Sequence, residues 1–364
     1  MIKVTLVAGA RPNFMKIAPM IHAIQAKIKE GADLSFRLVH TGQHYDKKMS
    51  GDFFEQLNIP EPDANLGGGG GTQAEQTAAI MVAFEKELLA HKPDLVIVVG
   101  DVTSTLACSI TAKKLVVDVA HVEGGIRSGD LSMPEEINRM VTDSITDHFF
   151  TTSEIANNNL RKLGFPESSI HFVGNTMIDT LMANMPRFKK PEGELFEQLQ
   201  PQSYFVMTMH RPANVDQEEK LKEMIDAIMK GTKGLPVIFP VHPRTAKNLQ
   251  NLGINDPNLH MTDPLSYLEF NYLVKNAKGV ITDSGGITEE ASVMNVPCIT
   301  LRDNTERPET IELGTNELVG TDPKKLPPYL EKLMNNQWKK YQGIPMWDGK
   351  TAERIVDKIL EIYR

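Results

Sequence analysis

The chain has 364 residues, a length that predicts about two domains, and its 39 Lys and Arg against 47 Asp and Glu give a formal net charge of −8. An acidic chain without a block of basic residues is a poor candidate for binding nucleic acid, and no apolar run approaches the ~18 residues that a membrane span needs. The two cysteines, Cys108 and Cys298, lie far apart in apolar surroundings, which excludes a disulfide framework and favours a cytoplasmic protein.

Short β-branched runs alternate with segments of helical period from the amino terminus onward. In the first half the expected strands are 2–7, 35–40, 95–99, 117–122, 148–151 and 170–173, and the expected helices are 13–30, 72–91, 103–115, 135–146 and 154–163. The run 95–99 is apolar throughout, which is typical of a parallel strand buried on both faces. The alternation predicts an α/β fold with crossover helices.

The same alternation restarts near residue 204. The expected strands are 204–209, 237–241, 259–262, 280–283 and 298–301, and the expected helices are 217–230, 264–277, 286–294 and 323–335. We therefore expect one domain at 1–173 and a second at 174–350. The polar, proline-containing stretch 186–203 is expected to be a surface excursion of the second domain, and the last helix, 351–364, could pack back on the first domain or lie on the second.

Three short motifs occur in the same order in both halves, each at the end of an expected strand. They are Arg11-Pro12 and Arg211-Pro212, then Val39-His40 and Val241-His242, then Asp101 and Asp283. This repetition favours two similar, Rossmann-like doubly wound domains. Because such domains bind ligands at the carboxyl ends of their strands, we expect the two to face each other across a cleft.

The strongest local signal is Ser284-Gly285-Gly286, which joins an expected strand to an expected helix. Free backbone amides and the positive end of the helix dipole there favour a phosphate, and the glycines let its oxygens approach the backbone. Glu290 follows at roughly 9 Å along the helix, a distance that suits a carboxylate binding ribose hydroxyls. The alternative is an ordinary serine N-cap with glycines in a tight turn.

Cationic residues also gather at strand ends. Arg11 and Lys16 follow the first strand, and His210, Arg211 and His242 take the corresponding places in the second half. In a chain of negative net charge this concentration predicts an anionic ligand. The alternative for Arg11 is that its guanidinium only caps backbone carbonyls.

Carboxylates form the third group. Asp101 and Glu123 each follow an apolar strand, where a charge is costly unless it has a task or a partner such as Arg127. Glu135 opens a helix, and its spacing of four residues from Arg139 predicts that the two share a helix face. Opposite a cationic phosphate clamp, these carboxylates predict proton transfer on a phosphate-activated substrate. The bland alternatives are a helix N-cap for Asp101 and a macrodipole role for Glu135.

Two further patterns predict no site of their own. The spacing of His40 and His44 is that of a helical zinc pair, but Thr41-Gly42 after a strand is not helical, so no metal site is expected. The five consecutive glycines at 67–71 predict a loop that could serve as a lid or only as a spacer. Phe270 is expected in the core, or as the wall of a base pocket.

Taken together, the motifs resemble the non-hydrolysing UDP-N-acetylglucosamine 2-epimerases. In the first half the matching stretches are Gly9-Ala-Arg-Pro, His40-Thr-Gly-Gln-His, Val98-Val-Gly-Asp, His121-Val-Glu-Gly-Gly-Ile-Arg, Met133-Pro-Glu-Glu-Ile-Asn-Arg and Val173-Gly-Asn-Thr. In the second half they are Met209-His-Arg-Pro, Pro240-Val-His-Pro, Thr282-Asp-Ser-Gly-Gly-Ile-Thr-Glu-Glu and Thr305-Glu-Arg-Pro-Glu. Single motifs recur among nucleotide-sugar enzymes, but the set in this order is specific to the family.

The resemblance implies two Rossmann-like domains facing across a cleft, as in the GT-B glycosyltransferases, and a homodimer. It implies epimerisation at C2 of a UDP-N-acetylhexosamine, feeding surface polysaccharide synthesis. UDP would leave by trans-elimination, giving 2-acetamidoglucal, and would add back after a proton reached the opposite face. No redox or metal cofactor is expected.

The resemblance also assigns roles to residues of this chain. The implied acid–base residues are Asp101, Glu123, Glu135 and His210, and the implied substrate-binding residues are Arg11, Lys16, Arg139, His242, Phe270, Ser284, Gly285, Gly286 and Glu290. Some relatives bind a second UDP-N-acetylglucosamine beside the active site, and Gln43 and Arg211 match positions of that allosteric set. Asp46 and the loop 67–71 stand where such relatives carry Gln and Arg, so we expect a hyperbolic dependence of rate on substrate concentration.

Three alternatives stay open. Close relatives epimerise a UDP-2,3-diacetamido uronic acid sugar. A GT-B glycosyltransferase would use the same UDP clamp and pass the sugar to an acceptor. A nucleotide-sugar sensor would bind without turnover, and binding alone would need none of Asp101, Glu123 and Glu135.

Overall fold

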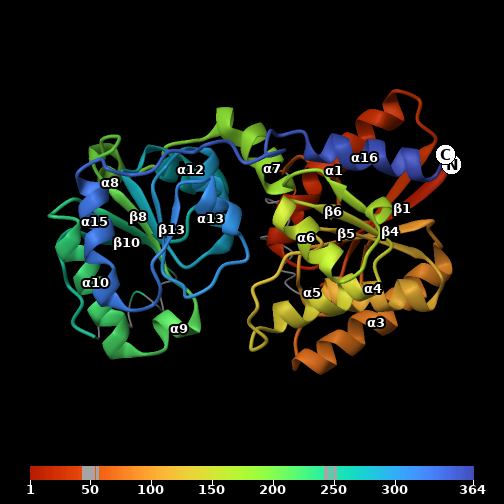
Figure 1. Cartoon of the computed structure of the whole chain (residues 1–364), viewed down its shortest axis with the longest axis horizontal. Coiled ribbons are helices and arrows are strands. Elements are labelled where there is room, and N and C mark those ends of the chain that lie inside the picture. Colours follow the sequence, from red (N-terminus) through yellow and green to blue (C-terminus); the bar gives the residue numbers. More distant parts are fainter. Residues whose placement is uncertain (43–53, 55–56, 242–245, 247–248, 250–251) are drawn as a thin grey trace. The chain divides into compact units, whose positions relative to one another are not determined.

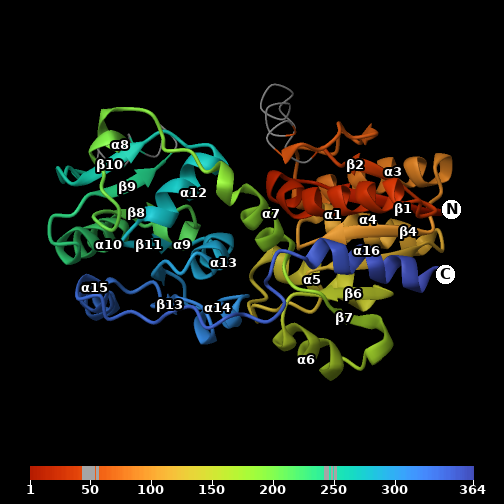
Figure 2. The same ribbon diagram turned by 90° about the horizontal axis from the view of Figure 1, so that it is seen from above.

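The computed structural model describes all residues except 43–53, 55–56, 242–245, 247–248 and 250–251. The chain divides into two compact units (Figures 1 and 2). The first unit comprises Met1–Thr180 and Pro345–Arg364, and the second comprises Leu181–Ile344. The C-terminal segment therefore belongs to the first unit.

In the described residues, the first unit is built on one seven-stranded sheet in the order β3-β2-β1-β4-β5-β6-β7. All of its strand pairs are parallel. The strands are β1 (Ile2–Ala8), β2 (Leu34–His40), β3 (Ala64–Asn65), β4 (Leu95–Val99), β5 (Asp118–Val122), β6 (His148–Thr151) and β7 (Ile170–Phe172).

Helices cover both faces of this sheet, as Figure 1 shows. They are α1 (Arg11–Lys29), α3 (Gln73–Ala90), α4 (Thr103–Lys114), α5 (Pro134–Ser144), α6 (Glu154–Lys162), α7 (Thr176–Asn184, which crosses the unit boundary) and α16 (Thr351–Ile362), with a 3-10 turn at Glu167–Ser169. Apolar side chains of α3 and α4, among them Phe84 and Cys108, pack on Val96 and Val98 of β4. Helix α16 packs beside α1 on the opposite face.

The second unit repeats this plan with a six-stranded sheet, in the described residues, of order β10-β9-β8-β11-β12-β13, again with parallel pairs. Its strands are β8 (Phe205–Thr208), β9 (Val237–Pro240), β10 (Leu259–Thr262), β11 (Gly279–Thr282), β12 (Cys298–Thr300) and β13 (Asn316–Leu318). Its helices are α8 (Glu194–Gln198), α9 (Pro212–Val215), α10 (Glu218–Gly231), α12 (Tyr267–Asn276), α13 (Gly285–Val293), α14 (Pro308–Glu312) and α15 (Pro327–Met334), with 3-10 turns at Met185–Arg187 and Pro323–Lys325.

Strand alternation divides the apolar side chains of the second unit between two core layers. Phe205 and Met207 of β8 face a layer closed by α10 and α15, whereas Val206 faces a layer that includes Phe196 of α8 and Val274 of α12. Successive side chains of a strand point to opposite faces, so a parallel strand covered by helices is apolar at every position. The predicted α/β class is confirmed for both units.

Each sheet has one place where the strand order reverses. In the first unit β1 lies between β2 and β4, and in the second β8 lies between β9 and β11. Ligands of doubly wound sheets bind outside the carboxyl ends of the strands at this point. A ligand site is therefore expected at the residues that follow β1 and β4 and at those that follow β8 and β11.

Several element bounds differ from the sequence prediction for local reasons. Helix α12 begins at Tyr267 because Ser266 and Glu269 form a capping box there. The expected helix 323–335 is a 3-10 turn followed by α15, which starts at Pro327. The stretch 186–203 is not only a surface excursion, since it contains α8, and Phe196 and Leu199 are buried in the core.

Candidate active site

The turn between β1 and α1 is fastened to the end of β4 by one side chain. Asn13 accepts hydrogen bonds from the amides of Gly9 and Ala10 and donates from Nδ2 to the Val99 carbonyl, 3.1 Å away. One turn later on the same helix, Lys16 pairs with Glu123, with 2.8 Å between Nζ and Oε2. The strand ends of β1, β4 and β5 therefore meet around this ion pair.

Glu123 has an unusual backbone conformation. It follows β5 with φ of 73°, in the left-handed region that costs free energy for a residue with a side chain. Its amide donates to the Phe150 carbonyl, and its side chain is only 4% exposed. Lys16 lies against Gly100 as well, because a Cβ on that glycine would stand 3.3 Å from Nζ. A strained, buried carboxylate held by a cation is a candidate functional group.

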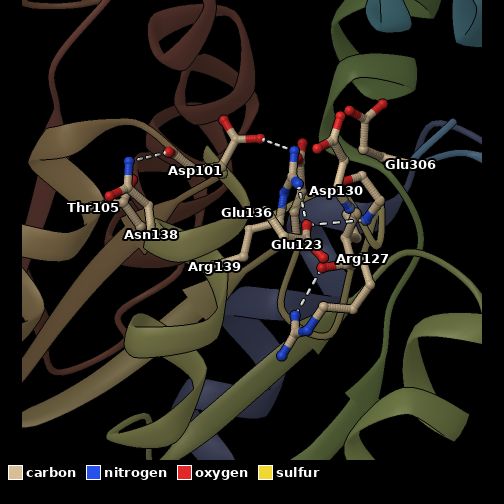
Figure 3. A network of polar contacts seen from close by, with 12 residues as sticks. Asp101, Thr105, Glu123, Arg127, Asp130, Glu136, Asn138, Arg139 and Glu306 are labelled. Atoms are coloured by element: carbon tan, nitrogen blue, oxygen red, sulfur yellow. Dashed lines mark hydrogen bonds and ion pairs between the residues drawn. The ribbon is translucent and has the colours of Figure 1, made fainter. Parts of the chain in front are cut away.

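Asp101 begins a chain of charged groups that runs through Arg139 to Glu136 (Figure 3). The guanidinium of Arg139 stands 2.6 Å from Asp101 Oδ2 and 2.6 Å from Glu136 Oε2. Asn138, on the same helix, donates to the Asp101 carbonyl. Asp101 is half-exposed, so its carboxylate is accessible to a ligand, whereas Arg139 and Glu136 are buried.

Two ion pairs near these residues were not predicted from the sequence. On helix α5 the carboxylate that pairs with Arg139 is Glu136, three residues away, while Glu135 is half-buried in the first turn. Burial opposes ionisation of Glu136, yet bonds from the amides of Ser128 and Gly129 and from Arg139 lower its pKa. Arg127, named as the bland partner of Glu123, pairs with Asp143.

In the second unit, Asp283 follows β11 and organises the turn after β8. Its Oδ2 accepts hydrogen bonds from the amides of His210 and Arg211 and from Asn214 Nδ2. The imidazole of His210 lies 2.8 Å from Asp283 Oδ1. Burial alone would raise the pKa of Asp283, but these bonds hold it at about 2. His210 is 63% exposed, so its ring is accessible while Asp283 fixes one nitrogen.

The Ser284-Gly285-Gly286 turn leads from β11 into α13. Ser284 occupies the N-cap position, yet its side chain makes no capping hydrogen bond. The first turn of α13 has no acidic residue, and a Cβ on Gly286 would meet no atom within 4 Å. The Ser284 amide donates to Thr282 Oγ1, so the amides of Gly285 and Gly286 are the ones open to an anion, as the phosphate interpretation requires.

Glu290 lies farther along α13 and is buried. Tyr267 donates to its Oε1 at 2.7 Å. Burial is the main reason that the pKa of Glu290 rises to about 7, although the Tyr267 hydrogen bond works in the opposite direction. Phe270 lies on α12, the same helix as Tyr267, and packs half-buried against the core. Tyr267 thus joins α12 to the helix that carries the phosphate turn.

Several predicted residues cannot be placed in this geometry. Gln43 and His242 lie outside the described residues, and of Arg11 only the backbone position, at the start of α1, is described. Arg211 is described, and it bonds from Nε to the Asp283 carbonyl. In the loop 67–71, which forms neither helix nor strand, the Gly68 amide donates to the Thr41 carbonyl at the end of β2.

Some residues that organise this geometry could not be found from the sequence, because only their place in the fold distinguishes them. Asn13 and Tyr267 have no motif that marks them apart from ordinary helix residues. Asp283 was named among the repeated strand-end motifs, but no role was given to it. Among the described residues, no group of three or more His, Cys, Asp and Glu is arranged to hold a metal ion. No described helix combines the length and apolar character needed to cross a bilayer.

Comparisons with known proteins identify relatives over nearly the whole chain. The family model of UDP-N-acetylglucosamine 2-epimerase matches residues 26–360. A relative from Methanocaldococcus jannaschii named UDP-N-acetylglucosamine 2-epimerase is 43% identical, covering 97% of this chain and 98% of its own. A relative from Pseudomonas aeruginosa named UDP-2,3-diacetamido-2,3-dideoxy-D-glucuronate 2-epimerase is 39% identical, covering 87% of this chain and 88% of its own.

Solved structures give the same answer for the fold. The crystal structure of the Methanocaldococcus jannaschii enzyme in complex with UDP-GlcNAc and UDP superposes with a TM-score of 0.85 at 42% identity, covering 99% of this chain and 100% of that one. A structure from Listeria monocytogenes described as a UDP-N-acetylglucosamine 2-epimerase gives a TM-score of 0.88 at 29% identity, covering 100% and 96%. The two parallel sheets are thus those of a GT-B-like fold. The chain belongs to the UDP-N-acetylglucosamine 2-epimerase family of isomerases.

Proposed function

We propose that the protein interconverts UDP-N-acetylglucosamine and UDP-N-acetylmannosamine by eliminating UDP across C1–C2 and adding it back. The observation that carries this proposal is the group of paired charges at the carboxyl edge of the first sheet, Lys16 with Glu123 and Asp101 with Arg139. The relative that crystallised with UDP-GlcNAc and UDP supports the choice of nucleotide sugar.

The chemistry explains why carboxylates and cations are both needed. The C2 proton is not next to a carbonyl, so a base removes it only as the C1–O bond breaks and positive charge builds at C1. Cations must then stabilise the departing diphosphate, a task for preorganised charges such as Lys16. A proton must leave one face of C2 and arrive on the other, so at least two acid–base groups are required. We assign these to Glu123 and Asp101, with Glu135 and His210 as further members of the set.

The nucleotide would be held by the second unit. The Ser284 side chain and the amides of Gly285 and Gly286 suit a diphosphate, and Glu290 suits the ribose hydroxyls. Phe270, on the neighbouring helix α12, would line the uracil pocket. Arg11, Arg139 and His242 complete the proposed substrate-binding set.

A second substrate is favoured by one finding. The Pseudomonas aeruginosa relative, named for a UDP-2,3-diacetamido uronic acid sugar, is 39% identical over 322 residues. The same elimination and re-addition would serve that sugar. We further propose that the protein works as a cytoplasmic homodimer and that its product feeds surface polysaccharide synthesis.

The test is turnover of each UDP-sugar by the protein alone in heavy water. We expect the C2 epimer to form without an acceptor, with deuterium at C2 of both product and recovered substrate, detected by NMR. Product without C2 deuterium would contradict elimination. Sugar transfer that starts only on adding an acceptor would indicate a glycosyltransferase, and binding without turnover would indicate a sensor.

The matching variant is Glu123→Gln, which keeps the size of the side chain and removes the base. We expect kcat to fall by at least ~10²-fold, the low end for general acid–base catalysis, while UDP affinity measured by calorimetry stays the same. The control is Glu154→Gln, at an exposed ion pair with Arg161 on α6, which should keep full activity. Normal activity of Glu123→Gln would remove Glu123 from the mechanism.

A further inference from the structure

Beneath the charged edge of the first sheet lies a pair that none of the proposed steps uses, His121 and Asp143. Both side chains are fully buried. His121 is the residue of β5 two positions before Glu123, and Asp143 lies on α5, the helix of Glu135 and Arg139. The distance between His121 Nδ1 and Asp143 Oδ1 is 2.7 Å.

The second ring nitrogen of His121 faces a backbone carbonyl. His121 Nε2 lies 2.7 Å from the carbonyl oxygen of Gly100, the residue before Asp101. A carbonyl only accepts hydrogen bonds, and so does an ionised carboxylate. The ring must therefore donate from both nitrogens, which only the imidazolium form can do.

The other contacts of Asp143 support its ionised form. Its Oδ2 accepts from the Gly125 amide at 3.0 Å and from Arg127 Nη1 at 2.6 Å. Burial opposes ionisation, yet the bonds from His121 and Arg127 lower the pKa of Asp143. The charged groups around the ring are thus Asp143 directly and Arg127 through it.

These contacts join the backbone segments that carry the proposed acid–base groups. The ring holds the turn after β4, where Gly100 has φ of 72° and Asp101 follows. Asp143 holds the turn after β5 through Gly125, two residues past Glu123. That turn has little room to move, since a Cβ on Gly125 would stand 2.5 Å from the Ala156 carbonyl oxygen.

We propose that His121 and Asp143 are positioning residues, an imidazolium–carboxylate clamp that sets Asp101 and Glu123 at the spacing that the reaction needs. Neither touches the substrate in this proposal, which rests on the proposed epimerase activity. The clamp acts on kcat because a shift of the acid–base groups by about 1 Å can cost ~10²-fold in rate. It acts little on UDP binding, because Ser284, Gly285, Gly286 and Glu290, which would hold the nucleotide, lie in the second unit.

The kinetic test uses Asp143→Asn and His121→Phe in the full-length protein. In Asp143→Asn an amide NH₂ replaces one acceptor oxygen, and in His121→Phe both N–H donors are lost. We expect kcat per folded molecule to fall about 10- to 100-fold while KM and the Kd of UDP change by less than about twofold. The control is His148→Phe, a histidine at the first position of β6 in the same sheet, which should keep kcat whatever it does to Tm.

A substrate-free measurement separates this proposal from the epimerase activity. Nitrogen-15 NMR of the unliganded protein should show two ring-bound protons on His121 at pH 7, lost in His121→Phe. The backbone amide signals of Asp101 and Glu123 should move in both variants and stay in place in the control. A His121 ring with one proton, or variants with normal kcat, would overturn the clamp. An inactive wild type with this NMR signature would refute the epimerase activity and leave the clamp geometry standing.

Discussion

The side chain of Glu290 titrates in the range where the protein would work. Burial raises the pKa of Glu290 to about 7, against the effect of the Tyr267 hydrogen bond. The ionised carboxylate accepts from the ribose hydroxyls more strongly than the neutral acid does. The ionised fraction of a group with this pKa rises about tenfold between pH 6 and pH 8. We therefore expect UDP to bind up to about tenfold more tightly at pH 8 than at pH 6.

Calorimetric titration of UDP at both pH values measures this effect. The diphosphate has its own ionisation near this range, so the comparison with Glu290→Gln is the informative one. At pH 8 that variant should bind UDP more weakly by about 1.5–3 kcal/mol, the value of hydrogen bonds to a charged group. Parallel pH profiles for the two proteins would show that Glu290 does not bind the nucleotide.

At this scale the sequence indicates candidate positions but not which groups pair. Asp101 and Glu123 could be found because a charge after a buried strand needs a reason. The partner of Arg139 could not, because Glu135 and Glu136 are both within reach on one helix. The choice of Glu136 depends on the amides of Ser128 and Gly129, which also bond to it. The conformation of that loop leaves no periodic pattern in the sequence, so it could not be predicted.

Among the elements, β6 and β7 carry two half-buried histidines whose environment disfavours the charged form. His148 and His171 lie with their rings 6.0 Å apart, and Tyr363 beyond α16 contacts His148. Burial lowers the pKa of both, and for His171, with help from His148 and Lys358, to about 4. Asp118, Asp147 and Glu361 act in the opposite direction and Lys113 in the same direction.

The sign of the resulting pH dependence follows from proton counting. In the unfolded chain each histidine takes up a proton near pH 6.5, whereas in the folded chain they stay neutral to lower pH. The unfolded state therefore binds more protons as pH falls from about 6.5 to about 4, and stability is lost over that window. We expect the Tm of His171→Phe to fall less between pH 7 and pH 5 than that of the wild type, by a few degrees. Calorimetry showing the same decrease in both would contradict this account.

Long elements could be predicted from the sequence because their period is repeated many times. Helix α3 was expected at 72–91 and runs from Gln73 to Ala90, with Thr72 and Glu75 forming its capping box. Short elements such as α8 and β13 were missed. A helix of five residues is not stable on its own, and α8 exists because Phe196 packs into the core. That contact is tertiary and leaves no local pattern.

At the scale of the whole molecule, the repetition of motifs predicted two sheets of the same class, and the structure has them. The return of the chain to the first unit was harder to predict, because 351–364 is an amphipathic helix that would suit either. Specific bonds decide it. Asp179 accepts hydrogen bonds from the amides of Thr351 and Ala352, and Trp347 donates to the Thr152 carbonyl.

The proposed homodimer has a candidate surface in the first unit. Exposed apolar side chains lie on two helices of one layer, Val82 and Leu89 on α3 and Ile137 and Met140 on α5. Helix α4 packs against both α3 and α5, so the three form a continuous face (Figure 1). Large exposed apolar patches are uncommon on monomers and mark association surfaces. In a dimer with two-fold symmetry, these side chains of one copy would pack against the same side chains of the second copy.

The double variant Ile137→Glu with Met140→Glu tests that surface. Carboxylates there would have to be buried in the dimer, which opposes association. In sedimentation equilibrium we expect the wild type to have twice the chain mass of 40.5 kDa and the variant to have 40.5 kDa. The circular dichroism spectrum of the variant should remain that of the folded protein. Leu163→Glu, at an exposed leucine after α6, is the control and should stay dimeric. A wild type that sediments at 40.5 kDa would refute the dimer, and a dimeric double variant would place its interface elsewhere.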